Sequence, residues 1–387
     1  MVLYDGPKDG PKDGPKDGPK SVNIPETADG AGVASAQLAH ALAVTHDGVT
    51  GYWDASVETD VVEGAPKPLD LDKLGYLSAL RRREVLAGAL LSQFSVKRED
   101  NGASVWVNSK QICSITKPTS DDLVGQLQWL RNYADLRGDR IPEIVEQTGG
   151  VMAFFGALAH LNNSRRRASL EFLSIVQSVT TLVEMQVKHY CWTPRPIDLA
   201  PQIHPIIQTP DHSSYPSGHA TESFAIATVL HRLMTGKRLK DTDAASTPPM
   251  PLRIAHRIAV NRTIAGVHYP IDSAAGAMLG FAIGEAILAM AEGKEMLEFE
   301  FGSTRSLERS DIPALPTGDE PTGDGPNAGN ETSSSEDGPT TKQTGDFTLS
   351  WLKDNLVAET PYEAAETPVV PLVQTAFGEV GREWRRE

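Results

Sequence analysis

The chain has 387 residues, of which 40% are hydrophobic and 22% charged, and its formal net charge is -15. This acidic balance argues against a general role in nucleic-acid binding, because contacts to a phosphate backbone require a basic face. The two cysteines, Cys113 and Cys191, are too few for a disulfide-rich scaffold and are typical of a reducing compartment.

The chain begins with a low-complexity segment. Residues 5–20 are four copies of Asp-Gly-Pro-Lys, and both Gly and Pro break helices and strands. A basic start followed by an apolar stretch is absent here, so we expect no signal peptide and a cytoplasmic location. Residues 1–30 are predicted to be a disordered tail, which either is merely solvated or binds an unknown protein partner.

Helical periodicity dominates residues 31–305, which are predicted to form one folded domain. Strand signals are sparse, and residues 104–115 are expected to form a minor hairpin or loop. The predicted fold class is all-α, a multi-helix bundle flanked by disordered tails. The expected helices span residues 70–94, 120–136, 151–161, 166–192, 218–233, 252–265 and 271–290.

Residues 274–291 are apolar enough to raise the question of a membrane span. A bilayer span needs about 20 strongly apolar residues. This segment is instead rich in Ala and Gly and carries Glu285 in its middle. We therefore expect a buried core helix and no membrane span.

Residues 306–387 are predicted to be a linker and a C-terminal tail. Residues 316–346 are rich in Gly, Pro and Ser with an acidic bias, which is typical of a linker. Beyond them, the apolar residues Phe347, Trp351 and Leu352 can dock either on the folded domain or on a partner, and the sequence does not decide between the two.

The first motif with chemical content is KHYCWTPRP, which runs from Lys188 to Pro196. The preceding helix must end near Pro194, because proline lacks an N–H and disfavours helix in the residue before it. Lys188 then lies in the last turn and Arg195 just beyond it, so both can reach one point past the helix end. Alternatively, the two cations only complement the helix dipole.

The second motif is YPSGHA, which runs from Tyr215 to Ala220 within the stretch HSSYPSGHA. Ser217 can cap a helix, and Gly218 lets another group approach the backbone closely. The first N–H groups of such a helix bind anions, and His219 beside them can donate or accept a proton. The alternative is a serine-capped helix with an incidental histidine.

The third motif is NRTIAGVHYPID, in which Arg262 and His268 are six residues apart. Gly266 is expected to end one helix and Pro270 to start the next, so the break can turn His268 back toward Arg262. Asp272 can accept a hydrogen bond from the His268 ring, leaving the other nitrogen to attack a substrate or to bind metal. Alternatively, Asp272 only complements the helix dipole.

Together the three motifs supply three cations, a helix N-terminus and two histidines, a set suited to a tetrahedral oxyanion. Their spacing resembles the three-part signature of the superfamily that joins type 2 phosphatidic acid phosphatases, bacterial class A acid phosphatases and vanadium-dependent haloperoxidases. The match extends from Lys188 to Asp272. It departs at Asn261, where many members have Ser.

The resemblance implies a helical bundle of the acid phosphatase and haloperoxidase type, often dimeric, and it implies roles for the motif residues. In a phosphatase, His268 would be the nucleophile and His219 would protonate the leaving alcohol. In a haloperoxidase, His268 would instead be the metal ligand, binding the vanadium of a vanadate cofactor, and His219 would assist peroxide binding. The residues that would hold phosphate or vanadate are Lys188, Arg195, Ser217, Gly218 and Arg262.

His212 bears on the choice between these activities. It stands five residues before Ser217, where bromide-oxidising members of the superfamily carry a histidine, although it can also be an exposed loop residue. With the expected solubility and lack of an export signal, it favours a vanadate-dependent haloperoxidase that oxidises bromide or iodide with hydrogen peroxide. The alternative is a soluble phosphomonoesterase acting through a phosphohistidine. A third hypothesis is a scaffold or storage protein that binds phosphate without turnover.

Overall fold

A computed structural model describes residues 43–45, 71–241, 248–294, 296–302, 346–356 and 370–384. The predicted N-terminal tail at residues 1–30 and residues 316–345 of the predicted linker lie outside this described part. The domain boundaries given by the sequence therefore stay a prediction.

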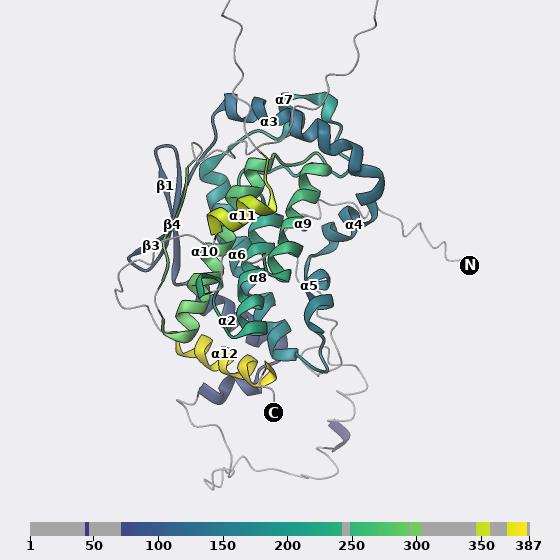
Figure 1. The fold of residues 1–387 in the computed structure, drawn as a ribbon. Coiled ribbons are helices and arrows are strands. Elements are labelled where there is room, and N and C mark those ends of the chain that lie inside the picture. Colours follow the sequence, from purple (N-terminus) through teal and green to yellow (C-terminus); the bar gives the residue numbers. More distant parts are fainter. Residues whose placement is uncertain are drawn as a thin grey trace, which may run out of the picture.

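Four long helices form the centre of the molecule (Figure 1). They are α6 (Arg167–Cys191), α8 (Gly218–Thr235), α9 (Met250–Ile264) and α10 (Pro270–Glu292). All four had been predicted from helical periodicity, with ends that differ by a few residues.

Small residues allow α8 and α10 to pack closely. Gly276, Gly280 and Gly284 recur every fourth residue along the face of α10 that meets α8. A Cβ atom on Gly280 would lie 2.2 Å from the main-chain oxygen of Thr221. Side chains at these positions would therefore force the two helices apart.

The helix predicted to be a core helix, α10, is buried along its length. By length and composition it could cross a membrane, but every residue of its most apolar stretch is buried inside the protein. The charged residue in the middle of α10, Glu285, accepts a hydrogen bond of 2.6 Å from Nε of Arg238, and both side chains are buried. An internal ion pair thus compensates the charge in the middle of this helix.

Shorter helices surround the central four. The segment 70–94, predicted to be one helix, is divided into a 3-10 turn, η1, and α2, because Ser78 caps a new helix start. Thr119 caps the helix that begins at Ser120, because its Oγ1 accepts a hydrogen bond from Asp122 N. The helix at 137–149 was not predicted. The surrounding elements are η1 (Leu71–Tyr76), α2 (Ala79–Leu91), α3 (Ser120–Tyr133), η2 (Ala134–Leu136), α4 (Arg137–Gly149), α5 (Met152–Ala159), α7 (Pro196–Leu199), η3 (Pro201–Ile203) and η4 (Leu239–Asp241).

A small sheet lies along one side of the bundle, so the protein is mostly helical but not all-α (Figure 1). The strands β1 and β2 and the strands β2 and β3 are antiparallel, whereas β3 and β4 are parallel. Val105 and Ile115 are buried against the helices, which stabilises strands that a short alternating pattern only weakly indicates. The strands are β1 (Phe94–Glu99), β2 (Gly102–Val107), β3 (Lys110–Thr116) and β4 (Phe299–Phe301).

The C-terminal region contributes two helices that pack on the bundle, α11 (Leu349–Leu356) and α12 (Pro371–Trp384). Phe347 and Leu352 are buried, and the Phe347 ring packs edge-on against Phe224 of α8 at a centroid distance of 6.2 Å. Of the two alternatives that the sequence left open, docking on the folded domain is the one observed.

The last helix, α12, contacts the N-terminal end of α6, which is the end away from Lys188. The Glu383 carboxylate accepts hydrogen bonds from the main-chain N–H groups of Ala168 and Ser169, at 2.8 and 2.9 Å. These N–H groups lie in the first turn of α6 and have no partner within the helix. Glu383 therefore caps α6 from a distant part of the chain.

Candidate active site

The three sequence motifs meet where four helix ends converge. The C-terminal ends of α6 and α9 and the N-terminal ends of α8 and α10 lie at the same end of the bundle (Figure 1). Main-chain contacts hold the ends together, since Ser217 N donates to the main-chain oxygen of Asp272 at 2.9 Å. The three motifs, which are separated in the sequence, therefore lie together in one compact cluster.

Lys188, in the last turn of α6, is 1% exposed. Its ammonium group donates to the main-chain oxygen of Ser213 at 3.2 Å and to that of Pro216. These contacts draw the loop before α8 onto the end of α6. Burial lowers the pKa of Lys188 to about 8, although the carboxyl group of Glu184 opposes this shift.

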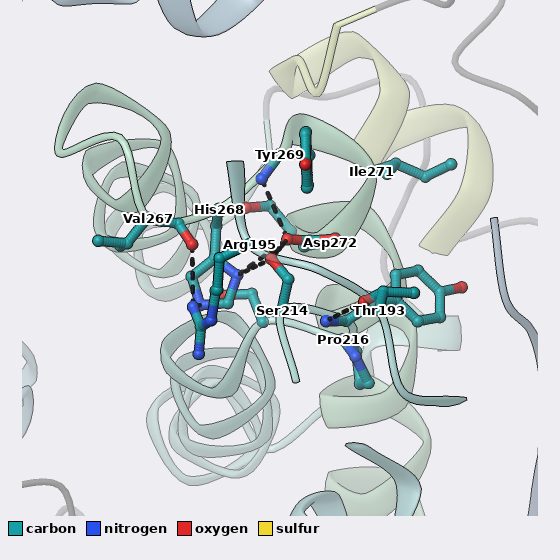
Figure 2. A network of polar contacts seen from close by, with 12 residues as sticks. Thr193, Arg195, Ser214, Pro216, Val267, His268, Tyr269, Ile271 and Asp272 are labelled. Atoms are coloured by element: carbon teal, nitrogen blue, oxygen red, sulfur yellow. Dashed lines mark hydrogen bonds and ion pairs between the residues drawn. The ribbon is translucent and has the colours of Figure 1, made fainter. Parts of the chain in front are cut away.

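Arg195 connects the first and the third motif (Figure 2). Its guanidinium Nη1 donates to the main-chain oxygen of Val267 at 2.9 Å and lies 3.1 Å from Nε2 of His268. The backbone is fixed as well, since Arg195 N donates to Asp198 Oδ2 at 2.8 Å. The charge of Arg195 is thus placed beside the His268 ring.

His268 and Asp272 form a buried pair (Figure 2). Nδ1 of His268 lies 2.9 Å from Oδ2 of Asp272, and that oxygen also accepts from Tyr269 N at 3.0 Å and from Ser214 Oγ at 2.5 Å. A guanidinium can only donate, so Nε2 of His268 accepts from Arg195 and Nδ1 carries the proton. The hydrogen bond predicted between Asp272 and His268 is therefore present.

The protonation of this pair follows from its burial. Burial, with Arg195 and Lys188 nearby, lowers the pKa of His268 well below its usual value, so the ring is neutral. Burial raises the pKa of Asp272 to about 6, against the hydrogen bonds from Ser214 and Tyr269. At neutral pH the site thus contains a neutral imidazole, with its Nε2 lone pair held in place by an ionised carboxylate.

The second motif forms the start of α8. Ser217 is the N-cap, and its Oγ accepts from Ala220 N at 3.5 Å. A Cβ atom on Gly218 would lie 2.6 Å from Oε1 of Glu184, so a larger residue here would require the Glu184 carboxyl group to move. The first turn of α8 directs its N–H groups and its positive dipole end toward the cluster.

Glu184 was not predicted as a site residue. It lies one turn before Lys188 on α6 and is buried against the start of α8. Burial and the neighbouring Glu222 raise the pKa of Glu184 to about 8, against the attraction of Lys188. Its helical spacing from Lys188 was the available signal, but only the tertiary structure shows that it faces Gly218.

His219 and Arg262 both contact Gln147 of α4. Nε2 of His219 lies 3.2 Å from the main-chain oxygen of Gln147, and Nη2 of Arg262 donates to Gln147 Oε1 at 2.7 Å. Asn261, where the resemblance departs from the usual serine, also donates to Gln147 Oε1, at 3.1 Å. Its role in this structure is to hydrogen-bond α4.

His212 lies at the edge of the cluster and is half-buried. Its Nδ1 is 3.2 Å from Nη2 of Arg195 and 3.3 Å from the main-chain oxygen of Ser213. The structure thus places His212 beside the cluster and not in a remote loop.

The cluster can hold an oxyanion and act on it. Lys188, Arg195 and Arg262 are buried cations, and the start of α8 adds N–H donors. In the described part of the chain, no group of three or more His, Cys, Asp or Glu side chains could hold a metal ion. A vanadate bound through one histidine needs no such group, and the same cations fit vanadate and phosphate alike.

Comparison with known proteins agrees with this geometry. A model of the PAP2 superfamily matches residues 168–295. The decaprenylphosphoryl-5-phosphoribose phosphatases of two Mycobacterium tuberculosis strains are each 28% identical to the chain over 145 residues. That alignment covers 38% of this chain and 72% of each mycobacterial protein.

Proposed function

We propose that this chain, whose residues 168–295 form a PAP2 superfamily domain, is a phosphatase that hydrolyses phosphomonoesters through a phosphohistidine. The sequence alone placed halide oxidation first and phosphoester hydrolysis second. The similarity to a phosphatase supports the second hypothesis better. The observation that carries the proposal is the neutral, buried His268 with Nδ1 on Asp272 and Nε2 beside Arg195.

In the first half of the reaction, the substrate phosphate binds to Lys188, Arg195 and Arg262 and to the N–H groups at the start of α8. Arg195 then exchanges its contact with His268 for the phosphate oxygens. Nε2 of His268 attacks phosphorus, and the bond from phosphorus to the ester oxygen breaks. The departing oxygen takes a proton from His219 and leaves as the alcohol.

In the second half, water replaces the alcohol. His219, now deprotonated, takes a proton from this water as the water oxygen attacks phosphorus. The bond from phosphorus to Nε2 breaks, which releases inorganic phosphate and restores neutral His268. Asp272 keeps the proton of the ring on Nδ1 throughout and stabilises the positive charge of the phosphorylated ring.

One experiment separates hydrolysis from halide oxidation. An aryl phosphate is supplied with and without vanadate, and in parallel bromide, peroxide and a phenolic dye are supplied with vanadate. We expect hydrolysis that vanadate inhibits, because vanadate resembles the transferring phosphoryl group and competes for the same cations. Vanadate-dependent bromination of the dye without hydrolysis would instead support a haloperoxidase, with vanadate held by His268 and with His212 near the halide.

The mycobacterial relative suggests a second substrate to test. By its name, that protein removes phosphate from a pentose phosphate carried on a prenyl lipid. Comparing an aryl phosphate with a prenyl-linked pentose phosphate at equal concentration tests whether this chain shares that preference. A higher kcat/KM for the lipid-linked substrate would extend the proposal to lipid-linked esters. Equal values of kcat/KM would indicate that the enzyme recognises only the phosphate group of its substrate.

A further inference from the structure

Gln147 lies near the C-terminal end of α4, outside the segment that matches the family model. The matching segment starts at residue 168, whereas α4 ends at Gly149. Gln147 is nevertheless fully buried and contacts residues from two of the three motifs. A part of the chain beyond the family domain therefore reaches into the site.

The side chain of Gln147 holds one edge of Arg262. Its Oε1 accepts from Arg262 Nη2 at 2.7 Å and from Asn261 Nδ2 at 3.1 Å. The main-chain oxygen of Ile144, one turn earlier on α4, accepts from the same Arg262 nitrogen at 3.2 Å. The position of the guanidinium is thus set from α4.

The orientation of the amide is determined by its other end. Gln147 Nε2 donates to Oε1 of Glu143 at 3.1 Å. A carboxylate only accepts, so the NH₂ group faces Glu143 and the oxygen faces Arg262. Glu143 is in turn held by Arg257, whose Nε and Nη2 donate to its two oxygens at 2.8 and 2.7 Å.

The main chain of Gln147 contacts the second motif. Its carbonyl oxygen lies 3.2 Å from Nε2 of His219, and a carbonyl can only accept. Nε2 of His219 therefore carries a proton. The contact fixes the orientation of the ring that would donate a proton to a leaving group in the proposed reaction.

We propose that Gln147 is a positioning residue, whose carboxamide orients Arg262 toward the bound phosphate and whose main-chain carbonyl orients His219. This inference rests on the proposed function for the role of His219, whereas the role in anion binding is independent of turnover. The neutral amide matters, because it fixes Arg262 without cancelling the positive charge.

The test compares Gln147→Met, Gln147→Glu and the control Gln177→Met by calorimetric titration with inorganic phosphate. Gln177 is also a buried glutamine in a long helix, but its amide donates to Glu222. Gln147→Met should raise the Kd for phosphate about tenfold, the scale of one hydrogen bond to a charged group. Gln147→Glu should raise it further, because its carboxylate pairs with Arg262 and competes with the anion.

Hydrolysis of an aryl phosphate provides the second readout. Gln147→Met keeps the main-chain contact to His219, so KM should rise more than kcat falls. Circular dichroism and denaturant titration check that each variant is folded. A residue that only stabilised the fold would lower the unfolding midpoint and leave Kd and KM unchanged.

The outcomes separate this inference from the proposed function. A Gln147→Met protein that binds phosphate with the wild-type Kd would overturn the positioning role, whatever its activity. Wild-type protein that binds phosphate but hydrolyses no ester would overturn the phosphatase, and the Kd comparison would still decide the role of Gln147 in binding. Failure of the wild type to bind phosphate would overturn both.

Discussion

Two groups of buried charged side chains lie along α10, and they differ in how far positive and negative charges compensate each other. In the middle of the helix, Glu285 is matched by Arg238, one charge against one. At the start of the helix, the charges of Arg195 and Lys188 act on Asp272, and Arg262 of the third motif is buried as well. Glu184 lies beside them, and burial raises its pKa to about 8, which disfavours its negative charge.

The difference indicates which group serves the fold and which serves a ligand. Burial of a charge is costly unless an opposite charge and hydrogen bonds compensate it. The chain itself provides this compensation at Glu285. At the site, the buried cations Lys188, Arg195 and Arg262 outnumber the buried carboxyl groups of Asp272 and Glu184, and a bound phosphate would add negative charge.

The largest effect should follow from removing the nucleophile at the unbalanced group. His268→Ala should lower kcat/KM for an aryl phosphate by at least about 10³-fold, because it removes the ring nitrogen proposed to accept the phosphoryl group. Its free energy of unfolding should change little in comparison. Steady-state kinetics with denaturant titration measure both, and a fully active His268→Ala protein would refute the site.

At the ion pair of Arg238 and Glu285, we expect a large loss of stability and little change in activity. Arg238→Leu leaves the Glu285 carboxylate buried without its guanidinium and should cost about 3–5 kcal/mol of unfolding free energy. The folded fraction should keep its kcat/KM. Denaturant titration measures the loss, and the double variant Arg238→Leu with Glu285→Leu should recover much of it. An unchanged midpoint in the single variant would show that the pair is unimportant for stability.

The pH dependence tests the charges at the site. As pH falls through about 6, Asp272 takes up a proton and loses its charge beside His268, so kcat/KM should fall. As pH rises through about 8, Lys188 loses its proton and its attraction for phosphate, so kcat/KM should fall again. A bell-shaped profile is expected. Lys188→Arg should shift the alkaline limb of the profile to higher pH, because arginine stays protonated. An alkaline limb at unchanged pH would show that a group other than Lys188 titrates there.

The smallest effect is expected at the far end of α6. Glu383→Gln removes a negative charge from the start of that helix and should cost about 0.3–1 kcal/mol of unfolding free energy. Activity should not change, because Lys188 lies in the last turn of the same 25-residue helix. Thermal unfolding measures the loss of stability, and steady-state kinetics measure the activity. A loss of kcat/KM would show that α12 affects the site.

The sequence predicted the parts of the site that local chemistry controls. Pro194, Ser217, Gly266 and Pro270 each mark a helix boundary, and the structure has helix ends at or near all of them. The order of the motif residues then indicated an anion site. Ser214 lay within the quoted HSSYPSGHA stretch without an assigned role, because its bond to Asp272 spans 58 residues.

The remainder depends on contacts that no local pattern encodes. Gln147 and Glu184 are ordinary helix residues until α9 and α8 pack against them. The sheet was predicted only as a minor hairpin, since β1 is largely polar and β4 is three residues long. The helix α12 follows a long low-complexity stretch, and its function as a cap for α6 requires Glu383 to meet Ala168 in space.

In the proposed reaction, His268 carries the phosphoryl group during turnover. The most direct measurement is rapid acid-free quenching of the enzyme during hydrolysis of a ³²P-labelled aryl phosphate, followed by peptide mapping. We expect a base-stable, acid-labile phosphate on the peptide that contains His268, and none in the His268→Ala protein. Turnover with the label on a different residue, or with no labelled protein under conditions where the intermediate accumulates, would contradict it.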